Sequence, residues 1–252
     1  MQISIGLVKR FIIFLAIFSI SSCATSKKPR SLSELKSPEL QEKYQQAIKD
    51  AETADADEIN KDLTAITRYN PDLVWQDSLV STVTWTEWNG FDDKVGQRMD
   101  ITQDVWVTIV PELKRFCHQC DFSSQDLTLR LEQILGLPPH SEKTRFVEIW
   151  VDPSDIFRPA PDPEITDHEA ELDFPISGRF VTIDTGYQEW FNNLKGVSYQ
   201  EKGGYPWTRL GYSYDWGNPE SEVGLSEFVI RVGAVVTIGS IFTIEEYCEP
   251  SE

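Results

Sequence analysis

Two cysteines in the stretch FCHQC, residues 116–120, are the first residues whose types and spacing could do chemistry. A thiol pair with the spacing of Cys117 and Cys120 occurs in redox-active motifs, in halves of zinc sites and in ordinary disulfides. A third cysteine, Cys248, lies close to the end of the sequence. The choice among these uses depends on the compartment, because structural disulfides persist only in oxidising surroundings.

A second candidate is the aromatic stretch GYPWTRLGYSYDWGN, residues 204–218. If residues 210–216 form a strand, Tyr212, Tyr214 and Trp216 share one face, because side chains alternate along a strand. Such a face can stack on sugar rings or bind a partner protein. The same rings are suited to filling the core, which is the commoner use of aromatic residues. The residues predicted to contact a ligand are Trp207, Arg209, Tyr212, Tyr214, Asp215 and Trp216.

Asp215 is also the candidate for acid catalysis, since burial beside Trp216 would raise the pKa of its carboxyl group. A glycan hydrolase needs a second carboxylate roughly 5 to 10 Å away. Glu227 is the candidate that the sequence offers for this role. An open aromatic groove with two carboxylates would favour hydrolysis, a flat aromatic face would favour binding, and a buried face would leave a structural role.

An acidic segment follows in the middle of the chain. Eight carboxylates lie between Asp152 and Asp173, with Arg158 as the only basic residue. Calcium takes about six to eight oxygen ligands from flexible loops, but no glycine stands where the helix–loop–helix calcium motif needs its sharp turn. A solvated acidic loop is expected here, with a calcium site as the alternative.

Other catalytic motifs are incomplete. The chain has no G-x-G-x-x-G and no phosphate loop. Ser226 stands in a partial nucleophile elbow that lacks the second glycine, and His168 begins a zinc-protease pattern that has Leu172 in place of the second histidine. The sequence therefore predicts no metal site and no cofactor.

The first 23 residues resemble the signal peptide of bacterial lipoproteins. Lys9 and Arg10 precede a ten-residue apolar run, Phe11 to Ile20, which is too short to span a bilayer. The order Ile20-Ser21-Ser22-Cys23 then matches a lipobox: a large apolar residue, two small residues and a cysteine.

This resemblance implies cleavage before Cys23, a diacylglyceryl group on the Cys23 sulfur and acylation of the new amino terminus. Two or three acyl chains give a stable membrane anchor, whereas one chain gives only a marginal one. Ala24, rather than aspartate, follows the cysteine. By resemblance to the sorting rule of Gram-negative lipoproteins, this favours the outer membrane.

The mature chain is strongly acidic. From Cys23 onwards, 21 basic residues stand against 41 acidic ones, which gives a formal charge of −20, because residues 1–22 hold two basic residues and no acidic one. This charge excludes non-specific nucleic-acid binding. Expected partners are therefore the membrane, through the lipid on Cys23, and a protein or glycan of the envelope.

Lipidation of Cys23 leaves three cysteines in an oxidising compartment, namely Cys117, Cys120 and Cys248. Pro111-Glu112 is typical of a helix start, so Cys117 should lie near the carboxyl end of that helix, where a reactive thiolate is disfavoured. We therefore expect a structural disulfide. Its pairing is left open, since each of the three pairs is possible.

The elements that must position these residues change in character along the chain. Ser37-Pro38 begins a predicted helix, and Ile59, Leu63 and Ile66 repeat helical spacing until Asn70-Pro71. Beyond residue 71, β-branched and aromatic runs predict strands over residues 78–88, 104–110, 145–151, 178–185, 207–216 and 227–247. Short helices are predicted after Pro111, from Leu127 and over residues 187–194.

Because strands do not alternate with long helices, the predicted fold class is α+β: an N-terminal helical segment followed by a mainly antiparallel β domain with short helices. The predicted parts are a signal peptide (1–22), a lipidated tether (23–36), a helical segment (37–70) and a globular α+β domain (71–252).

The sequence thus predicts a lipid-anchored protein of the cell envelope, most simply a binding or assembly module for an envelope protein or glycan. The alternative is an envelope hydrolase that acts on glycans with Asp215 and a second carboxylate. Whether the protein is an enzyme is left open at this point.

Overall fold

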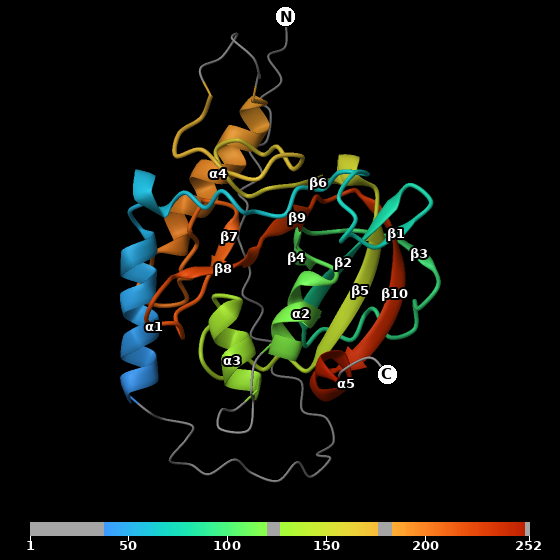
Figure 1. Cartoon of the computed structure of the whole chain (residues 1–252), viewed down its shortest axis with the longest axis horizontal. Helices are drawn as coiled ribbons and strands as arrows, with labels where there is room; N and C mark the ends of the chain where they lie inside the picture. The colour runs from blue at the N-terminus through green and yellow to red at the C-terminus, as the bar shows by residue number, and fades with distance from the viewer. Residues whose placement is uncertain (1–37, 120–126, 176–182, 250–252) are drawn as a thin grey trace, which may run out of the picture. The chain divides into compact units, whose positions relative to one another are not determined.

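Four of the predicted strand regions, residues 78–88, 104–110, 145–151 and 227–247, contribute strands to one antiparallel sheet (Figure 1). The structure is a computed structural model that describes residues 38–119, 127–175 and 183–249. Among these residues the strand order is β3-β10-β5-β2-β4-β9-β6, and β1 pairs with β2. The strands are β1 (Trp75–Gln76), β2 (Leu79–Thr86), β3 (Arg98–Asp100), β4 (Val105–Ile109), β5 (Arg145–Val151), β6 (Ile156–Phe157), β9 (Phe228–Ile230) and β10 (Val235–Thr243).

Short helices and a two-stranded ribbon accompany this sheet, so the fold is α+β, as the sequence predicts. The ribbon pairs β7 (Tyr212–Tyr214) with β8 (Val223–Ser226). The helices are α1 (Pro38–Ala51), η1 (Ala56–Glu58), α2 (Glu112–Gln119), α3 (Leu127–Ile134), η2 (Pro153–Asp155), α4 (Thr185–Ser198) and α5 (Ile244–Cys248).

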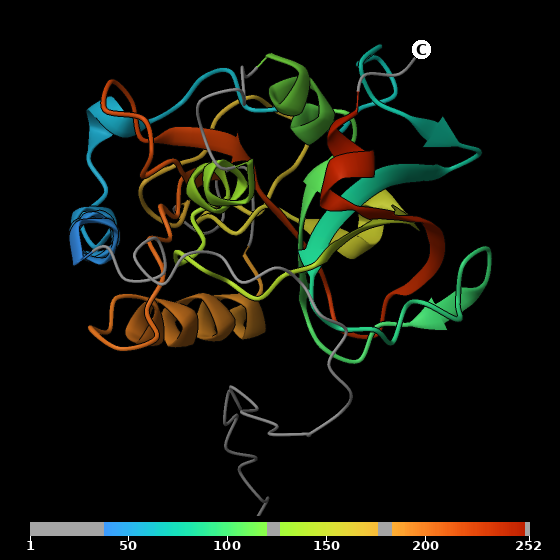
Figure 2. The same ribbon diagram turned by 90° about the horizontal axis from the view of Figure 1, so that it is seen from below.

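Successive side chains of the central strands point to opposite faces of the sheet, and both faces are covered by core residues. On one face Trp85 of β2 lies opposite Phe146 of β5, and their rings stack with centroids 5.4 Å apart. These rings share a core cluster with Leu113 and Leu131, so α2 and α3 cover this face together with α5 (Figure 2). On the other face Val80 and Ile149 belong to a second, larger cluster.

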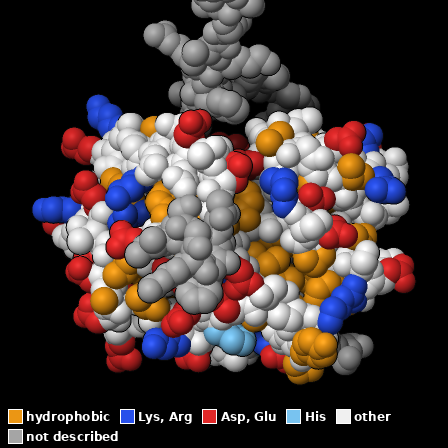
Figure 3. Space-filling model, turned by 90° about the horizontal axis from the view of Figure 1, so that it is seen from above, with side chains coloured by type: hydrophobic (Ala, Val, Ile, Leu, Met, Phe, Trp, Pro, Cys, Tyr) orange, Lys and Arg blue, Asp and Glu red, His pale blue; other side chains and the backbone are white. Residues whose placement is uncertain are grey.

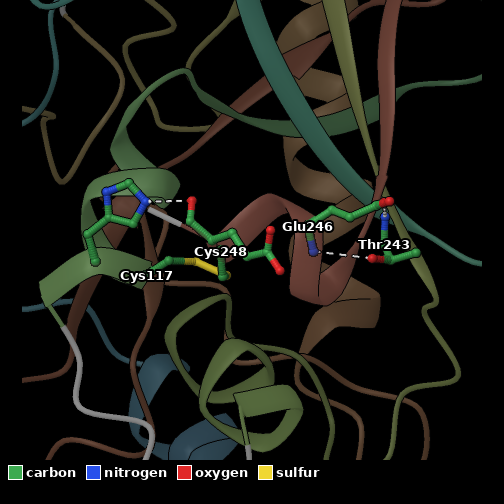
Figure 4. Close-up of a disulfide and its surroundings, with 6 residues drawn as sticks. Cys117, Thr243, Glu246 and Cys248 are labelled. Atoms are coloured by element: carbon green, nitrogen blue, oxygen red, sulfur yellow. Dashed lines mark hydrogen bonds between the residues drawn. A yellow bond between two sulfur atoms is a disulfide. The ribbon is translucent and has the colours of Figure 1, made fainter. Parts of the chain in front are cut away.

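A disulfide between Cys117 and Cys248 joins α2 to α5, with Cα atoms 5.1 Å apart (Figure 4). Cys117 lies near the carboxyl end of α2, as predicted. The helix α5 that carries Cys248 begins with a capping box, in which the Thr243 hydroxyl accepts a hydrogen bond from the Glu246 N–H. The expectation of a structural disulfide is confirmed, and one of the three possible pairings is selected. Cys120 lies outside the described residues.

The spacing of Ile59, Leu63 and Ile66 predicts a second helix before Asn70-Pro71, and this prediction is wrong. After η1 the chain runs without helix, because its backbone groups bond to distant segments: the Leu63 N–H donates to the His168 carbonyl (2.9 Å) and the Ile66 N–H to the Ile165 carbonyl (2.7 Å). Leu63 and Ile66 are buried all the same, 1% and 3% exposed, and Ile59 is partly buried. Hydrophobic spacing therefore identified the buried side chains but not the backbone conformation.

The remaining elements agree with the predictions in part. The described residues, from Pro38 of α1 to Glu249, belong to one compact unit. The strand predicted over 178–185 lies largely outside the described residues, and Thr185 begins α4. No helix among the described residues has the length and apolarity needed to cross a membrane.

Candidate functional site

The aromatic stretch singled out in the sequence lies inside the protein. Trp207, Tyr212 and Trp216 are 5%, 1% and 7% exposed, and Tyr214 is half-buried. The strand here is β7, which is shorter than the predicted 207–216. Of the uses left open for this stretch, packing in the core holds for Trp207, Tyr212 and Trp216, so these three rings present no open face to a ligand.

The N-terminal helix segment covers this stretch. The Tyr44 ring of α1 meets Trp216 edge to face, with centroids 5.8 Å apart. The Tyr212 hydroxyl donates to the Glu58 carbonyl (3.0 Å), and the Tyr214 hydroxyl donates to the Asp50 carboxylate (2.7 Å). The aromatic stretch thus forms the surface against which α1 and η1 pack.

Arg209 caps the carboxyl end of α1. Its Nη2 donates to the carbonyls of Ala51 (3.3 Å) and Glu52 (2.8 Å), groups that have no partner inside α1 because the helix stops there. Arg209 is 8% exposed and has a φ of 62°, a left-handed conformation that costs a non-glycine residue energy. The cation is therefore held in place by its capping role.

Asp215 is held by Arg130 of α3. The two guanidinium nitrogens donate to the two carboxylate oxygens at 2.7 and 2.6 Å, and the Gly217 N–H donates to the first oxygen at 3.0 Å. Asp215 is 1% exposed. Both oxygens of the carboxylate that was predicted to act in catalysis are occupied by a structural ion pair.

The acidic segment folds around its single arginine. Arg158 is fully buried, pairs with Asp167 and donates to the Glu169 carbonyl at 2.7 Å. An open pocket of ≈ 330 Å³ lies between Ile59 and residues 169–173. Within the described part of the chain, no three His, Cys, Asp or Glu side chains are grouped so that they could hold a metal ion.

An aromatic cluster that sequence reasoning missed lies where α4 meets one edge of the sheet. We call its four half-buried rings the aromatic platform: Trp106, Phe157, Tyr187 and Trp190. Trp106 of β4 and Phe157 of β6 both pair with Val229 of β9, so they flank the same strand. This neighbourhood depends on strand order, which no local sequence pattern encodes.

Close ring contacts hold the platform together. Trp190 meets Phe157 edge to face at 4.9 Å and stacks on Tyr187 at 5.5 Å. Behind them the buried Trp207 contacts both Trp106 and Trp190 at 6.3 Å. Trp207, a predicted ligand residue, therefore supports the platform from the inside.

Polar groups border the platform. The Trp190 indole N–H donates to the Asp104 carboxylate at 2.8 Å. The Tyr187 hydroxyl donates to the Ala160 carbonyl at 2.5 Å, and the pKa of this hydroxyl is raised, first by burial and further by the nearby Asp162 carboxylate. The two outer rings are thus oriented by specific hydrogen bonds.

Two glutamates close to β9 have raised pKa values, but their surroundings differ. Burial raises the pKa of Glu112 to about 7, against the hydrogen bonds that Ser226 and Thr64 donate to its carboxylate. Ser226 is itself buried in this network, which joins α2, β8 and the segment after η1. Burial alone raises the pKa of Glu227 to about 8. No described residue forms a hydrogen bond or ion pair with its carboxyl group.

Replacing Glu227 with glutamine is expected to stabilise the protein at alkaline pH. An acid whose folded-state pKa lies above its ordinary 4.5 favours the folded state when protonated, so stability falls from about pH 4.5 to 8 and is lower above that range. Glutamine cannot ionise, so Glu227→Gln should exceed the wild type by roughly 3 kcal/mol at pH 9 and match it at pH 4. Urea unfolding at both pH values measures the difference. The exposed control Glu189→Gln should change neither value, and parallel curves for Glu227→Gln and wild type would contradict the assignment.

Comparisons with protein-family models, curated proteins and solved structures found no match to this chain. Its function is therefore argued from its own residues and geometry.

Proposed function

We propose that this protein is a lipid-anchored binding module of the bacterial cell envelope and that its ligand contacts the aromatic platform. The lipobox ending in Cys23 supports the anchor, and Ala24 after it supports the outer membrane as the destination. The polar residues between Cys23 and α1 serve as the tether.

The observation that carries the binding role is the platform itself. Its four rings lie together and are half-buried, so part of each aromatic surface stays open to solvent and can stack on a ligand. Figure 3 views the molecule from above Figure 1, and hydrophobic side chains are open on this face among both acidic and basic side chains. Aromatic residues oriented by hydrogen bonds and bordered by polar groups are typical of ligand-binding surfaces.

The partner is an envelope protein or glycan. The formal charge of −20 on the mature chain disfavours nucleic acid and anionic lipid as ligands of the folded part. The platform therefore replaces residues 204–218 as the place where such a partner binds.

A hydrolase that acts on envelope glycans is the second candidate. Asp215 does not suit the acid role because Arg130 occupies both of its oxygens. Glu227 favours this alternative, since an acid held protonated near neutral pH is what a general acid requires. Its catalytic partner would have to be a second carboxylate roughly 5 to 10 Å away.

A photoreactive amino acid in place of the exposed Glu189, next to Trp190, tests the binding role in intact cells. We expect it to capture an envelope component, and Trp190→Ala in the same chain should abolish the capture. The matched control is the same photoreactive group at Val235, which is 40% exposed on β10 toward the other edge of the sheet. Equal capture from both positions, or capture that survives Trp190→Ala, would contradict the proposal.

The anchor is tested in the same cells with Cys23→Ser. Without the thiol no diacylglyceryl group can be attached, so the protein should leave the membrane fraction and the crosslink should be lost. Continued membrane partition of Cys23→Ser would rule out the lipid anchor.

A further inference from the structure

A carboxylate joins the aromatic platform to the turn between β9 and β10. One oxygen of Asp104 accepts a hydrogen bond from the Trp190 indole N–H at 2.8 Å, and the other accepts one from the Val232 backbone N–H at 3.0 Å. Asp104 is half-buried, and the Val232 side chain is 57% exposed. The carboxylate therefore contacts a platform ring at the surface of the protein.

The negative charge of Asp104 has no cationic partner among the described residues. None of their lysine or arginine side chains forms an ion pair with it. Arg231, which precedes Val232 in the turn, pairs instead with Asp155 at 3.6 Å. The two backbone and indole N–H groups orient the Asp104 carboxylate, but they do not neutralise it.

A second carboxylate lies beside Tyr187. Asp162 follows two residues after Ala160, whose carbonyl accepts the hydrogen bond of the Tyr187 hydroxyl at 2.5 Å. Within the described part of the chain, no lysine or arginine forms an ion pair with Asp162 either, and the buried Arg158 pairs with Asp167. Both rings that α4 supplies to the platform thus have a carboxylate near them that lacks a cationic partner.

We propose that the partner of the aromatic platform is a protein with a basic segment, and that an arginine or lysine of this segment lies over Trp190 and pairs with Asp104. This inference rests on the proposed binding function and specifies the partner. A cation is attracted to the face of an indole ring, and a planar guanidinium group can stack there while it donates hydrogen bonds to a carboxylate.

Asp104 is able to accept these hydrogen bonds. A carboxylate offers about four lone-pair positions, and the N–H groups of Trp190 and Val232 occupy two of them. The chain already shows the same ring geometry elsewhere, since the Arg68 guanidinium lies 3.9 Å from the centroid of the Trp75 ring.

Charge complementarity favours a basic segment over a neutral glycan. The mature chain has a formal charge of −20, which attracts a cationic partner over a distance, and a pair with Asp104 then fixes that partner at the platform. A neutral glycan could stack on the rings, but it would leave the charges of Asp104 and Asp162 without a partner.

The test uses the full mature chain in micelles of an uncharged detergent and two short peptides. One alternates glycine with arginine, and the other alternates glycine with citrulline, which has nearly the shape of arginine but no charge. The salt concentration is about 0.5 M, so that attraction over long distances is screened. Titration calorimetry should show that the arginine peptide binds about tenfold more tightly than the citrulline peptide, the effect of one charge-assisted hydrogen bond.

Substitutions then locate this preference. Asp104→Asn should reduce it to less than about twofold, because the paired charge is gone. The matched control is Glu245→Gln, which removes one exposed carboxylate from α5 and should keep the preference. Trp190→Ala should weaken the binding of both peptides. If Asp104 served only to orient Trp190, Asp104→Asn would weaken both peptides equally and leave the preference intact, which would overturn the pairing.

The comparison of the two peptides needs only the wild type, so it does not depend on any variant that fails to fold. Equal binding of the two peptides, or no binding of either, would overturn the basic segment. If the photoreactive group at Glu189 nevertheless captures an envelope glycan or an acidic protein, the binding module stands with a different partner. If neither peptide binds and nothing is captured, both proposals fail.

Discussion

Replacing Arg130 with alanine is expected to lower the free energy of unfolding by about 3 to 5 kcal/mol. The Asp215 carboxylate is 1% exposed and receives both of its short charged hydrogen bonds from this one guanidinium group. Removing the cation leaves a buried charge that neither water nor another cation reaches, which is far costlier than losing an exposed pair. Urea unfolding at pH 7 measures the loss.

The matched control is Arg115→Ala. Arg115 pairs with Asp72 at 2.8 Å, but both side chains are about half exposed, at 49% and 58%. Solvent screens an exposed pair of this kind, so Arg115→Ala should leave the free energy of unfolding almost unchanged. A double variant, Arg130→Met with Asp215→Leu, should recover much of the lost stability, because the uncompensated charge is gone. Equal losses in Arg130→Ala and Arg115→Ala would show that Asp215 is not buried as described.

This pair also bears on the hydrolase alternative. A catalytic acid must present its carboxyl oxygens to the substrate, whereas both oxygens of Asp215 accept hydrogen bonds from Arg130. Asp215 therefore acts as a fixed structural charge between α3 and the ribbon of β7 and β8. An acid catalyst in this protein would have to be sought at Glu227.

Much of the framework follows from local sequence. β2, β4 and β5 coincide with runs rich in β-branched and aromatic residues, which suit a pleated surface buried on both faces. α2 begins at Glu112, where Pro111 precedes an acidic residue. For these elements, side-chain shape and capping act on the backbone directly, so short-range patterns suffice.

Features that depend on distant segments could not be predicted in this way. Ile59, Leu63 and Ile66 repeat helical spacing, yet the backbone N–H groups of Leu63 and Ile66 donate to His168 and Ile165, and this segment forms no helix. The side chains of Tyr212 and Trp216 suit a surface as well as a core. They are buried here because the distant segments η1 and α1 pack on them. The platform arises only when Trp106 and Phe157 are brought together by strand order.

Removing the disulfide is the second change with a large expected effect. Cys117→Ser should lower the free energy of unfolding by about 4 to 5 kcal/mol, because the bond closes a loop with a sequence separation of 131 and so restricts the unfolded chain strongly. The folded state should retain its hydrophobic contacts, since Cys117 packs within the core cluster under α2 and α5. Thermal and urea unfolding, each with and without a reductant, measure the effect.

Cys120→Ser is the matched control, because it removes a thiol three residues along the chain and leaves the bond intact. It should unfold like the wild type, and adding reductant should lower the stability of both to that of Cys117→Ser. If Cys120→Ser were as unstable as Cys117→Ser, Cys120 would be the true partner of Cys248. Mass mapping of the protein from the cell envelope adds an independent check. Structural disulfides persist mainly in oxidising compartments, so finding Cys117 and Cys248 joined there would support the proposed location as well as the fold.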